Sequence, residues 1–343
     1  MAGMTNVQSL QGAQAAIEAV RCTPETSMTR WLYFTQGNFR WTFTQDALDF
    51  PQATRSFHGH RDFALGRYGN TFSYEEMMTY EDLPWWLRMI LKGGAAQGTG
   101  VTTGSTPPGY TYHSVPSSTE DDLDAFTMRY WEPSNIYQID RVMATSATFA
   151  FDAVNNPAWV LTADLLGHEL TEGAAYDDTV TELAREVIRA AGTKLYIDDD
   201  TDPIGTTLVT GKLRSGSITI DNQIETKAFS EDDLHDSCEV GRGEQLVTGE
   251  VVLEFRDDAE FAKMRAGATR RLRFEQTGSV IGATPATSKS LRIDIPEAHW
   301  MAPTMDYAGQ NKIQTFGFMG YTSPTNPQPI AIDVVNALAT VAA

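Results

Sequence analysis

Apolar residues that recur at every second position are the strongest constraint that this sequence places on its fold. In residues 249–275, GEVVLEFRDDAEFAKMRAGATRRLRFE, the apolar residues Val251, Leu253 and Phe255 alternate with mostly acidic neighbours. This period of two is typical of a strand with one buried face. Residues 271–275 alternate in the same way. The stretch therefore predicts two half-buried strands separated by a short helix.

The predicted helix has a start signal, an apolar face and a stop signal. Asp257 or Asp258 can accept hydrogen bonds from the unpaired N–H groups of its first turn. Phe261 and Met264 are three residues apart and therefore share a face. Gly267 tolerates the left-handed conformation that often ends a helix. None of these side chains is chemically reactive, so the unit is more typical of a structural protein than of an enzyme.

A second unit of the same plan precedes the first along the chain. In residues 72–94, FSYEEMMTYEDLPWWLRMILKGG, a strand pattern leads into a predicted helix. Pro84 lies in the first turn of that helix, where a missing N–H is tolerated. Trp85 and Trp86 supply its apolar mass, and Gly93 follows as a stop signal. We interpret the two units as copies.

Four pairs of similar segments support this duplication, because they occur in the same order in both halves with offsets of 163 to 174 residues. The pairs are GNFR from Gly37 with GKLR from Gly211, Gly93 with Gly267, MRYWEPSNIY from Met128 with LRIDIPEAHW from Leu291, and TFAF from Thr148 with TFGF from Thr315. The largest change of offset falls across a Gly/Ser/Thr/Pro-rich stretch, which predicts a long loop or hairpin arm in the first copy.

The predicted fold is mainly β with minor α, because period-two segments greatly outnumber helical ones. Two tandem β-sandwich modules, each with a short flanking helix, are expected. The predicted parts are an N-terminal arm (1–28), module 1 (29–156, with a long loop at 95–125), a connector with a helix at 178–191 (157–192), module 2 (193–323) and a C-terminal tail (324–343).

Composition limits the possible environments and partners. The chain has 343 residues, 41% of them hydrophobic and 21% charged, which suits globular domains. We find neither an apolar run of ~18 residues, as a membrane helix needs, nor a signal-peptide pattern. The net charge is −19, with 26 basic and 45 acidic residues. Tight sequence-independent binding of nucleic acid needs clustered basic residues, so we expect this surface to repel it.

No motif predicts a catalytic, cofactor or metal site. The two cysteines, Cys22 and Cys238, lie far apart in the sequence, so a disulfide framework is not implied and a reducing site of synthesis fits best. His58 and His60 in HGH are more typical of a surface loop than of a metal site. Asp198 to Asp202 resemble the start of a calcium loop, but the Gly and Glu that such a loop requires are absent. An acidic turn before a strand at 205–210 is the preferred interpretation, with a weak surface cation site as the alternative.

The second half of the chain resembles the tail tube (major tail) proteins of long-tailed bacteriophages. The segments that carry this resemblance are residues 193–222 (TKLYIDDDTDPIGTTLVTGKLRSGSITIDN), 247–267 (VTGEVVLEFRDDAEFAKMRAG), 271–274 (RLRF) and 290–300 (SLRIDIPEAHW). They cover roughly 130 residues well, whereas the first module is similar only loosely. No catalytic signature accompanies them.

The resemblance implies a structural virion protein that is made in the bacterial cytoplasm. Family members fold as a β-sandwich with a small helix, their sheets join into a ring-shaped β-barrel, and the rings stack into a tube with an acidic lumen. The implied partners are further copies of the chain and the tape measure, tail terminator and baseplate or tail-tip proteins. DNA would be a transient cargo that does not adhere, and no membrane, cofactor or enzymatic activity is implied.

If both halves are tube modules, three chains would supply the six modules of a ring; six chains per ring is the alternative. Candidates for structural or assembly roles are Trp85, Trp86, Val251, Leu253, Phe255, Phe261 and Met264. Candidates for contacts between stacked rings are Thr99, Gly100, Thr102, Thr103, Gly104 and Ser105 in the long loop. Other possible functions are a different ring-forming tail or injection-system component, such as a terminator, or a soluble β-sandwich binding protein.

Overall fold

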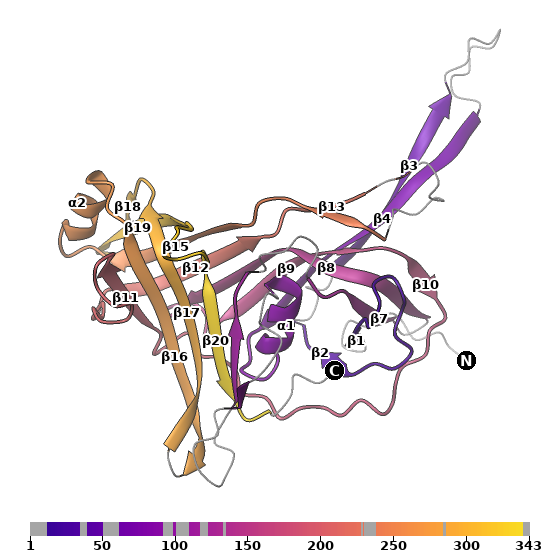
Figure 1. The fold of residues 1–343 in the computed structure, drawn as a ribbon, viewed down its shortest axis with the longest axis horizontal. Helices are drawn as coiled ribbons and strands as arrows, with labels where there is room; N and C mark the ends of the chain where they lie inside the picture. The colour runs from indigo at the N-terminus through magenta and orange to yellow at the C-terminus, as the bar shows by residue number, and fades with distance from the viewer. Residues whose placement is uncertain are drawn as a thin grey trace.

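Strands dominate the computed structural model of this chain (Figure 1). The structure describes residues 12–34, 40–50, 62–91, 99–100, 110–116, 123–132, 135–227, 229, 238–283 and 286–338. No helix among these residues is long and apolar enough to cross a membrane. The expected predominance of β structure with minor helix is confirmed.

The two helices are α1 (Leu83–Ile90) and α2 (Ala259–Arg265). The strands that precede residue 175 are β1 (Gly12–Ile17), β2 (Arg30–Leu32), β3 (Arg40–Phe50), β4 (Asp62–Met77), β5 (Thr99–Gly100), β6 (Tyr110–Ser114), β7 (Phe126–Glu132), β8 (Asn135–Asp152), β9 (Val160–Gly167) and β10 (Leu170–Glu172). The later strands are β11 (Lys194–Asp199), β12 (Leu213–Asp221), β13 (Ile224–Thr226), β14 (Val240–Arg242), β15 (Leu246–Glu254), β16 (Arg270–Ala283), β17 (Ala286–Trp300), β18 (Thr304–Ala308), β19 (Asn311–Gly320) and β20 (Ala331–Asn336).

Eighteen of these strands form one hydrogen-bonded network, and β13 and β14 pair separately. The network is consistent with a β-sandwich, but the sheet of this single chain does not close into a barrel. Figure 1 shows α1 among the strands near the middle of the molecule, α2 at one end and the β3–β4 hairpin standing out from the body.

Strand β8 connects two layers of the sandwich. Its first part pairs with β7 and β10, and its second part pairs with β9 and β12. The change of partners falls beside Arg141, whose φ of +46° is rare for a residue with a Cβ. A local turn of the backbone at this point redirects the strand, so one long strand belongs to both layers.

The two halves of the chain repeat one scheme of strand pairing. The pairs β3–β4, β4–β9, β8–β9, β7–β8, β8–β10 and β1–β7 in the first half correspond in order to β12–β15, β15–β19, β17–β19, β16–β17, β17–β20 and β11–β16 in the second. Helix α1 follows β4 as α2 follows β15. The repeated order of partners is independent of the sequence matches.

Two of the four sequence pairs do not fall on corresponding strands. Arg129 lies in β7 and Arg292 in β17, whereas the pairing scheme matches β7 with β16. TFAF lies in β8 and TFGF in β19, which also occupy different places. Arg40 in β3 and Arg214 in β12 do correspond, as do α1 and α2. Short alternating motifs recur by composition in any half-buried strand, which explains the false matches.

Helix α1 fills the core of the first half. All of its residues except Arg88 are buried, and Trp85 and Trp86 are at most 1% exposed. The ring centroid of Trp85 lies 4.5 Å from that of Phe126, and that of Trp86 lies 4.6 Å from that of Tyr74. Pro84 stands in the first turn, as expected.

Helix α2 has the predicted boundaries but a different environment. It begins after Asp258, and Gly267 just beyond its end has φ +66°. The carboxylate that accepts a backbone N–H at its start belongs to Asp257, with Ala259 N at 3.2 Å from Oδ1. None of its residues is fully buried. The sequence signals therefore located the helix correctly but did not show that it lies on the rim with little covering it.

The helix predicted at 178–191 is wrong. Residues 178–191 contain turns and extended chain, with isolated bridges from Thr79 to Val187 and from Ala158 to Arg189. Ile188 N donates to Met78 O, and Trp159 N donates to Ile188 O, both at 2.8 Å. These tertiary hydrogen bonds replace the i to i−4 bonds of a helix, so packing overrides the local helical pattern.

Four other expectations need correction. Residues 12–17, inside the expected N-terminal arm, form β1 between β2 and β7, and residues 331–336 of the expected tail form β20. The long loop contains β6, which pairs with β20. The strand expected at 205–210 is a loop that forms only one isolated bridge, from Leu208 to Tyr196.

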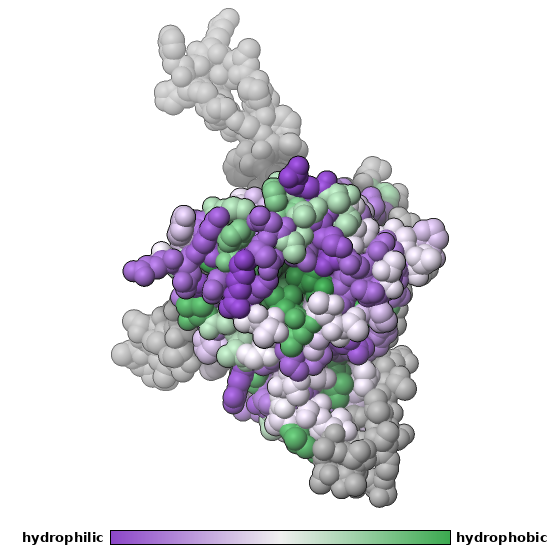
Figure 2. Space-filling model, turned by 90° about the vertical axis from the view of Figure 1, so that its left-hand side faces the viewer, coloured by the Kyte–Doolittle hydropathy of each residue, from purple (hydrophilic) through white to green (hydrophobic). Residues whose placement is uncertain are grey.

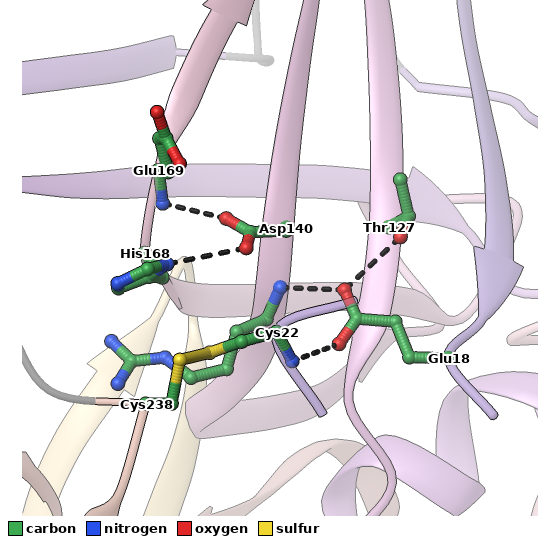
Figure 3. Close-up of a disulfide and its surroundings, with 8 residues drawn as sticks. Glu18, Cys22, Thr127, Asp140, His168, Glu169 and Cys238 are labelled. Carbon is green, nitrogen blue, oxygen red and sulfur yellow. Dashed lines mark hydrogen bonds and ion pairs between the residues drawn. A yellow bond between two sulfur atoms is a disulfide. The ribbon is translucent and has the colours of Figure 1, made fainter. Parts of the chain in front are cut away.

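The two cysteines are joined, contrary to the expectation from their spacing. Cys22 and Cys238 form a disulfide across a sequence separation of 216 residues (Figure 3). Cys22 follows β1 in a turn, and Cys238 precedes β14. Distance along a sequence says little about distance in a sheet of this topology. His58 and His60 lie outside the described residues.

Candidate functional surface

The two halves of the molecule are joined edge to edge by β8 and β12. Seven consecutive residue pairs, from Ser146 with Asp221 to Asp152 with Ser215, form this antiparallel joint. Thr148 Oγ1 and Thr219 Oγ1 lie 2.9 Å apart across it and share a hydrogen bond. The joint makes β4, β9, β8, β12, β15 and β19 neighbours in one continuous sheet.

One face of this continuous sheet supplies the core. On β8 and β12 the buried residues alternate with half-exposed ones: Phe149 and Ile218 are buried, and Thr148 and Thr219 are not. The same alternation holds on β15, where Val251 and Leu253 point into the core. Successive side chains of a strand point to opposite faces, so the half-exposed positions share the second face.

We call this second face the hydroxyl–carboxylate face. Its polar members are Ser73 and Glu75 from β4, Thr162 and Asp164 from β9, Ser146, Thr148 and Asp152 from β8, Ser215, Ser217, Thr219 and Asp221 from β12, and Thr248, Glu250 and Glu254 from β15. The apolar residues Met77, Val160, Ala150 and Val252 share the face. Along one row, Thr162, Thr148, Thr219 and Thr248 are consecutive cross-strand partners. Hydroxyls directly opposite each other stabilise a sheet modestly.

The hydroxyl–carboxylate face carries several carboxylates, and Arg214 of β12 is a nearby cation that contributes to the low pKa of Asp152. No Lys or Arg occurs within residues 73–77, 146–152, 160–164, 215–221 and 248–254. Burial alone would oppose ionisation of Asp152, but hydrogen bonds from Asn155 and from backbone N–H groups hold the pKa of this carboxyl below its ordinary value. The face can therefore offer negative charge and neutral hydroxyls to whatever lies opposite it.

Two strands at the ends of this sheet retain an edge that pairs with no other described strand. β3 pairs with β4, and β18 pairs with β19. β18 and its surroundings expose the apolar side chains Met301, Met305 and Tyr307. Figure 2 views the end of the molecule that carries α2 and β18, where apolar and hydrophilic residues are mixed. A strand edge with apolar side chains is prone to pair with another chain.

The structure places the candidate assembly residues in two groups. Trp85, Trp86, Val251 and Leu253 are buried within the chain, and Leu253, at 6%, is the most exposed of them. Phe255, Phe261 and Met264 are half-buried, and Met264 packs against the core. The first group holds the fold, and only the second has surface left for another chain.

The candidate loop for contacts between rings is described only in part. Thr99 and Gly100 form β5, which pairs with Thr111 and Tyr110 of β6. Thr102, Thr103, Gly104 and Ser105 lie outside the described residues.

The acidic turn at 198–202 is held by protein donors. Asp198 accepts backbone hydrogen bonds from Gly205 and Thr207, both at 2.6 Å, and these bonds outweigh the effect of burial and lower the pKa of its carboxyl. Asp199 accepts from Lys263 at 2.7 Å and also pairs with Arg270. The preferred interpretation as an acidic turn agrees with this geometry, because both carboxylates are bound by donors of the protein.

Sequence reasoning missed two features of the surface. It predicted alternation but could not say which strands would lie side by side, so the continuous face across β8 and β12 was not foreseen. It also missed the contact between Cys22, Cys238 and His168. A usable signal for the face was present in the sequence, since SATFAFD, SGSITID and TGEVVLE all alternate small polar or acidic residues with apolar ones.

Comparison with known proteins identifies one family. A family model described as phage tail tube protein matches residues 25–335, which is nearly the whole chain. No curated protein matches the chain.

Proposed function

Because the chain belongs to the phage tail tube protein family, we propose that it polymerises into stacked rings whose bore conducts the phage genome. Membership of the family gives the protein a structural role in the virion tail. Further copies of the chain are its main partners. Tape measure, tail terminator and baseplate or tail-tip proteins are its partners inside and at the ends of the tube.

Each ring contains three chains, and each chain contributes two tube modules. The observation that carries this proposal is the joint between β8 and β12, where the two halves already lie edge to edge in one sheet. The repeated scheme of strand pairing supports two equivalent modules. Three copies of such a pair make a pseudo-hexameric ring, in which every second junction lies within one chain.

The remaining junctions form between chains through the two strands with open edges. In the repeated scheme β3 corresponds to β12, and β18 with the end of β17 occupies the place of the second part of β8. A β18 edge that pairs with β3 of the next chain would therefore reproduce the β8–β12 joint. Closing the sheet in this way removes both exposed edges.

The hydroxyl–carboxylate face lines the bore of the tube. Its carboxylates repel the phosphate backbone, and its hydroxyls offer no fixed positive charge to hold it. The opposite face of the same sheet is committed to the core of each module, so it is unavailable to the genome. The net charge of −19 agrees with a surface that does not bind nucleic acid.

Electron microscopy of the purified full-length protein tests this function. Negatively stained samples at high concentration should contain hollow rods with a regular axial repeat, and averaged end views should show threefold symmetry. Light scattering on the same samples should report masses that are multiples of three chains. End views with six complete chains in each ring would contradict the trimeric arrangement but not the tube.

If no rods form, a second experiment is needed, because tube subunits can remain unassembled until an initiating complex is present. Particles of the phage, labelled with antibody against the chain, should then carry label along the whole tail. Label confined to one end of the tail would show a terminator or tip protein and would contradict the tube.

A further inference from the structure

Three metal-binding side chains meet where segments distant in sequence come together. Cys22, His168 and Cys238 each offer one ligand atom, and these atoms all lie within 4.8 Å of one another (Figure 3). Cys22 follows β1, His168 lies between β9 and β10, and Cys238 precedes β14. The two cysteines are joined as a disulfide with their Cα atoms 5.9 Å apart. A disulfide alone does not require an imidazole beside it.

His168 is oriented by a carboxylate. Its Nδ1 lies 3.2 Å from Oδ2 of Asp140, and the side chains of the pair are 12% and 6% exposed. The other oxygen of Asp140 accepts the backbone N–H of Glu169 at 2.6 Å, and the carbonyl oxygen of Asp140 accepts that of His168 at 3.0 Å. A carboxylate on a ring nitrogen is the arrangement found around most histidines that bind metal.

The turn that presents Cys22 is also fixed. Cys22 has φ +58°, a conformation that residues with a Cβ rarely adopt. Its backbone N–H donates to Oε2 of Glu18 at 2.9 Å, and Oε1 of the same carboxylate accepts from Thr127 Oγ1 and Arg141 N at 3.0 and 2.7 Å. Unfavourable backbone conformations persist where the surroundings enforce them, often at functional positions. Here the buried Glu18 carboxylate holds the turn and so the position of the thiol.

We propose that, when the disulfide is reduced, Cys22, Cys238 and His168 bind a divalent zinc-type ion, with water as the fourth ligand. Two thiolates and one imidazole are the donor set that zinc prefers, at about 2.3 Å from sulfur and about 2.0 Å from nitrogen. Ligands at those distances around a tetrahedral ion fit a cluster whose ligand atoms already lie this close together.

The two states interconvert by a balanced exchange. A phosphine or a dithiol supplies two electrons and cleaves the S–S bond, each sulfur takes up a proton, and each thiol loses it again when the metal binds. A disulfide oxidant removes the two electrons, the S–S bond forms again, and the ion leaves. A reducing cytoplasm keeps thiols reduced, so the metal form belongs to assembly and the disulfide to the released particle.

Both states connect the same two parts of the molecule. Cys238 leads into β14, which pairs with β13 apart from the other described strands. Cys22 is anchored beside β1 and β7 through Glu18 and Thr127. Ile224 and Val240 of this pair pack with Leu123, Ala125 and Met143 of the first half, and the metal would add a second attachment before oxidation can. The connection would survive a change of redox environment.

Cobalt binding by the full-length protein tests the proposal. Protein reduced with a phosphine under anaerobic conditions should take up one Co²⁺ per chain, with a thiolate-to-cobalt charge-transfer band and the visible bands of a tetrahedral ion. Added Zn²⁺ should remove these bands. Protein with an intact disulfide should show neither.

Single substitutions distinguish the metal ligand His168 from Asp140, which orients it. His168→Gln should weaken Co²⁺ binding and change the visible bands, and Asp140→Asn should lower the affinity about 10- to 100-fold with the bands unchanged. His113→Gln is the matched control, because His113 Nδ1 also lies beside a carboxylate, Asp333 Oδ1 at 2.5 Å, but His113 is not part of the cysteine cluster. It should bind Co²⁺ like the wild type.

Reduced wild-type protein without a charge-transfer band would overturn the proposal, even if every variant misfolded. A His168→Gln protein with unchanged affinity and spectrum would overturn it as well. If reduction alone unfolds the protein, recovery of the native circular dichroism on addition of Zn²⁺ supports the site, and failure to recover rejects it.

Discussion

Glu76 shows how one buried side chain can make stability depend on pH. Burial, with a further contribution from the charge of Asp82, raises the pKa of Glu76 from its ordinary value of 4.5 to about 8. The hydrogen bonds agree with a protonated side chain. Tyr74 Oη lies 2.7 Å from both Tyr33 O and Glu76 Oε2, but the hydroxyl has only one proton to donate. If Tyr74 donates to the carbonyl, a protonated Glu76 can donate to Tyr74.

The raised pKa predicts that stability falls as pH rises. Between about pH 4.5 and 8 the folded state keeps the Glu76 proton and the unfolded state does not, so the free energy of unfolding decreases across this window. Glu76→Gln has no proton to lose and should remove this part of the slope. Thermal unfolding at pH 5, 6, 7 and 8 measures it. A variant with the same slope as the wild type would show that Glu76 does not cause the dependence.

At the level of single elements, the sequence predicted those helix boundaries that depend on the backbone preferences of individual residues. Pro84, Asp257 and Gly267 mark helix ends through their own backbone preferences, and α1 and α2 lie where these residues indicate. Residues 178–191 have a helical pattern but form hydrogen bonds with Met78 and Trp159, which are distant in sequence. Patterns within a short stretch of sequence do not specify hydrogen-bond partners that are distant in the sequence. The disulfide was missed for the same reason.

Loss of a tryptophan from α1 should be much more damaging than loss of an aromatic residue from α2. Trp85→Ala removes a side chain that is fully buried, so it should lower the free energy of unfolding by about 3–5 kcal/mol. Phe261→Ala, on a helix with no buried residue, should lower it much less. Chemical denaturation of the two variants compares them. Similar losses would mean that α2 is buried in the form that was measured.

A lysine on the open edge should block assembly without unfolding the chain. Met305 in β18 is 47% exposed, and a charge there opposes pairing with another strand. Met305→Lys should therefore shift the protein from polymers to single chains in sedimentation experiments. Leu208→Lys, at a site that is 44% exposed and outside the named strands, is the control and should assemble normally. Rods from Met305→Lys would exclude β18 as the junction.

For the whole molecule, the sequence indicated the mainly β class of fold and the family. It did not indicate which face of the sheet would remain open. Alternation divides the residues of each strand into two sets, but only the order of the strands shows that Thr148, Thr219 and Thr248 belong to one surface. That order depends on pairing between segments that are distant in the sequence, such as β4 with β9 and β8 with β12.

Charge reversal on the hydroxyl–carboxylate face should make the tube retain DNA. In assembled tubes of an Asp221→Lys and Glu250→Lys double variant, cations would face the bore and bind phosphate. Retention of short duplexes after gel filtration should increase and should decline with added salt. A double variant with Asp178→Lys and Glu182→Lys has the same net charge at exposed residues outside the face and should retain less. Equal retention would place the face elsewhere in the tube.

In the proposed ring, the joint between β8 and β12 would also affect the kinetics of assembly. Because β8 and β12 belong to the same chain, their effective concentration for pairing is set by the segment that connects them. It does not fall when the protein is diluted. A ring of three chains would then need only two encounters between molecules before it closes, whereas a ring of six separate modules would need five. The rate of ring nucleation should therefore depend less steeply on protein concentration, and rings should form at lower concentrations of the chain. The two kinds of junction are also free to differ, one permanent from synthesis and the other weak enough to allow errors in assembly to be corrected.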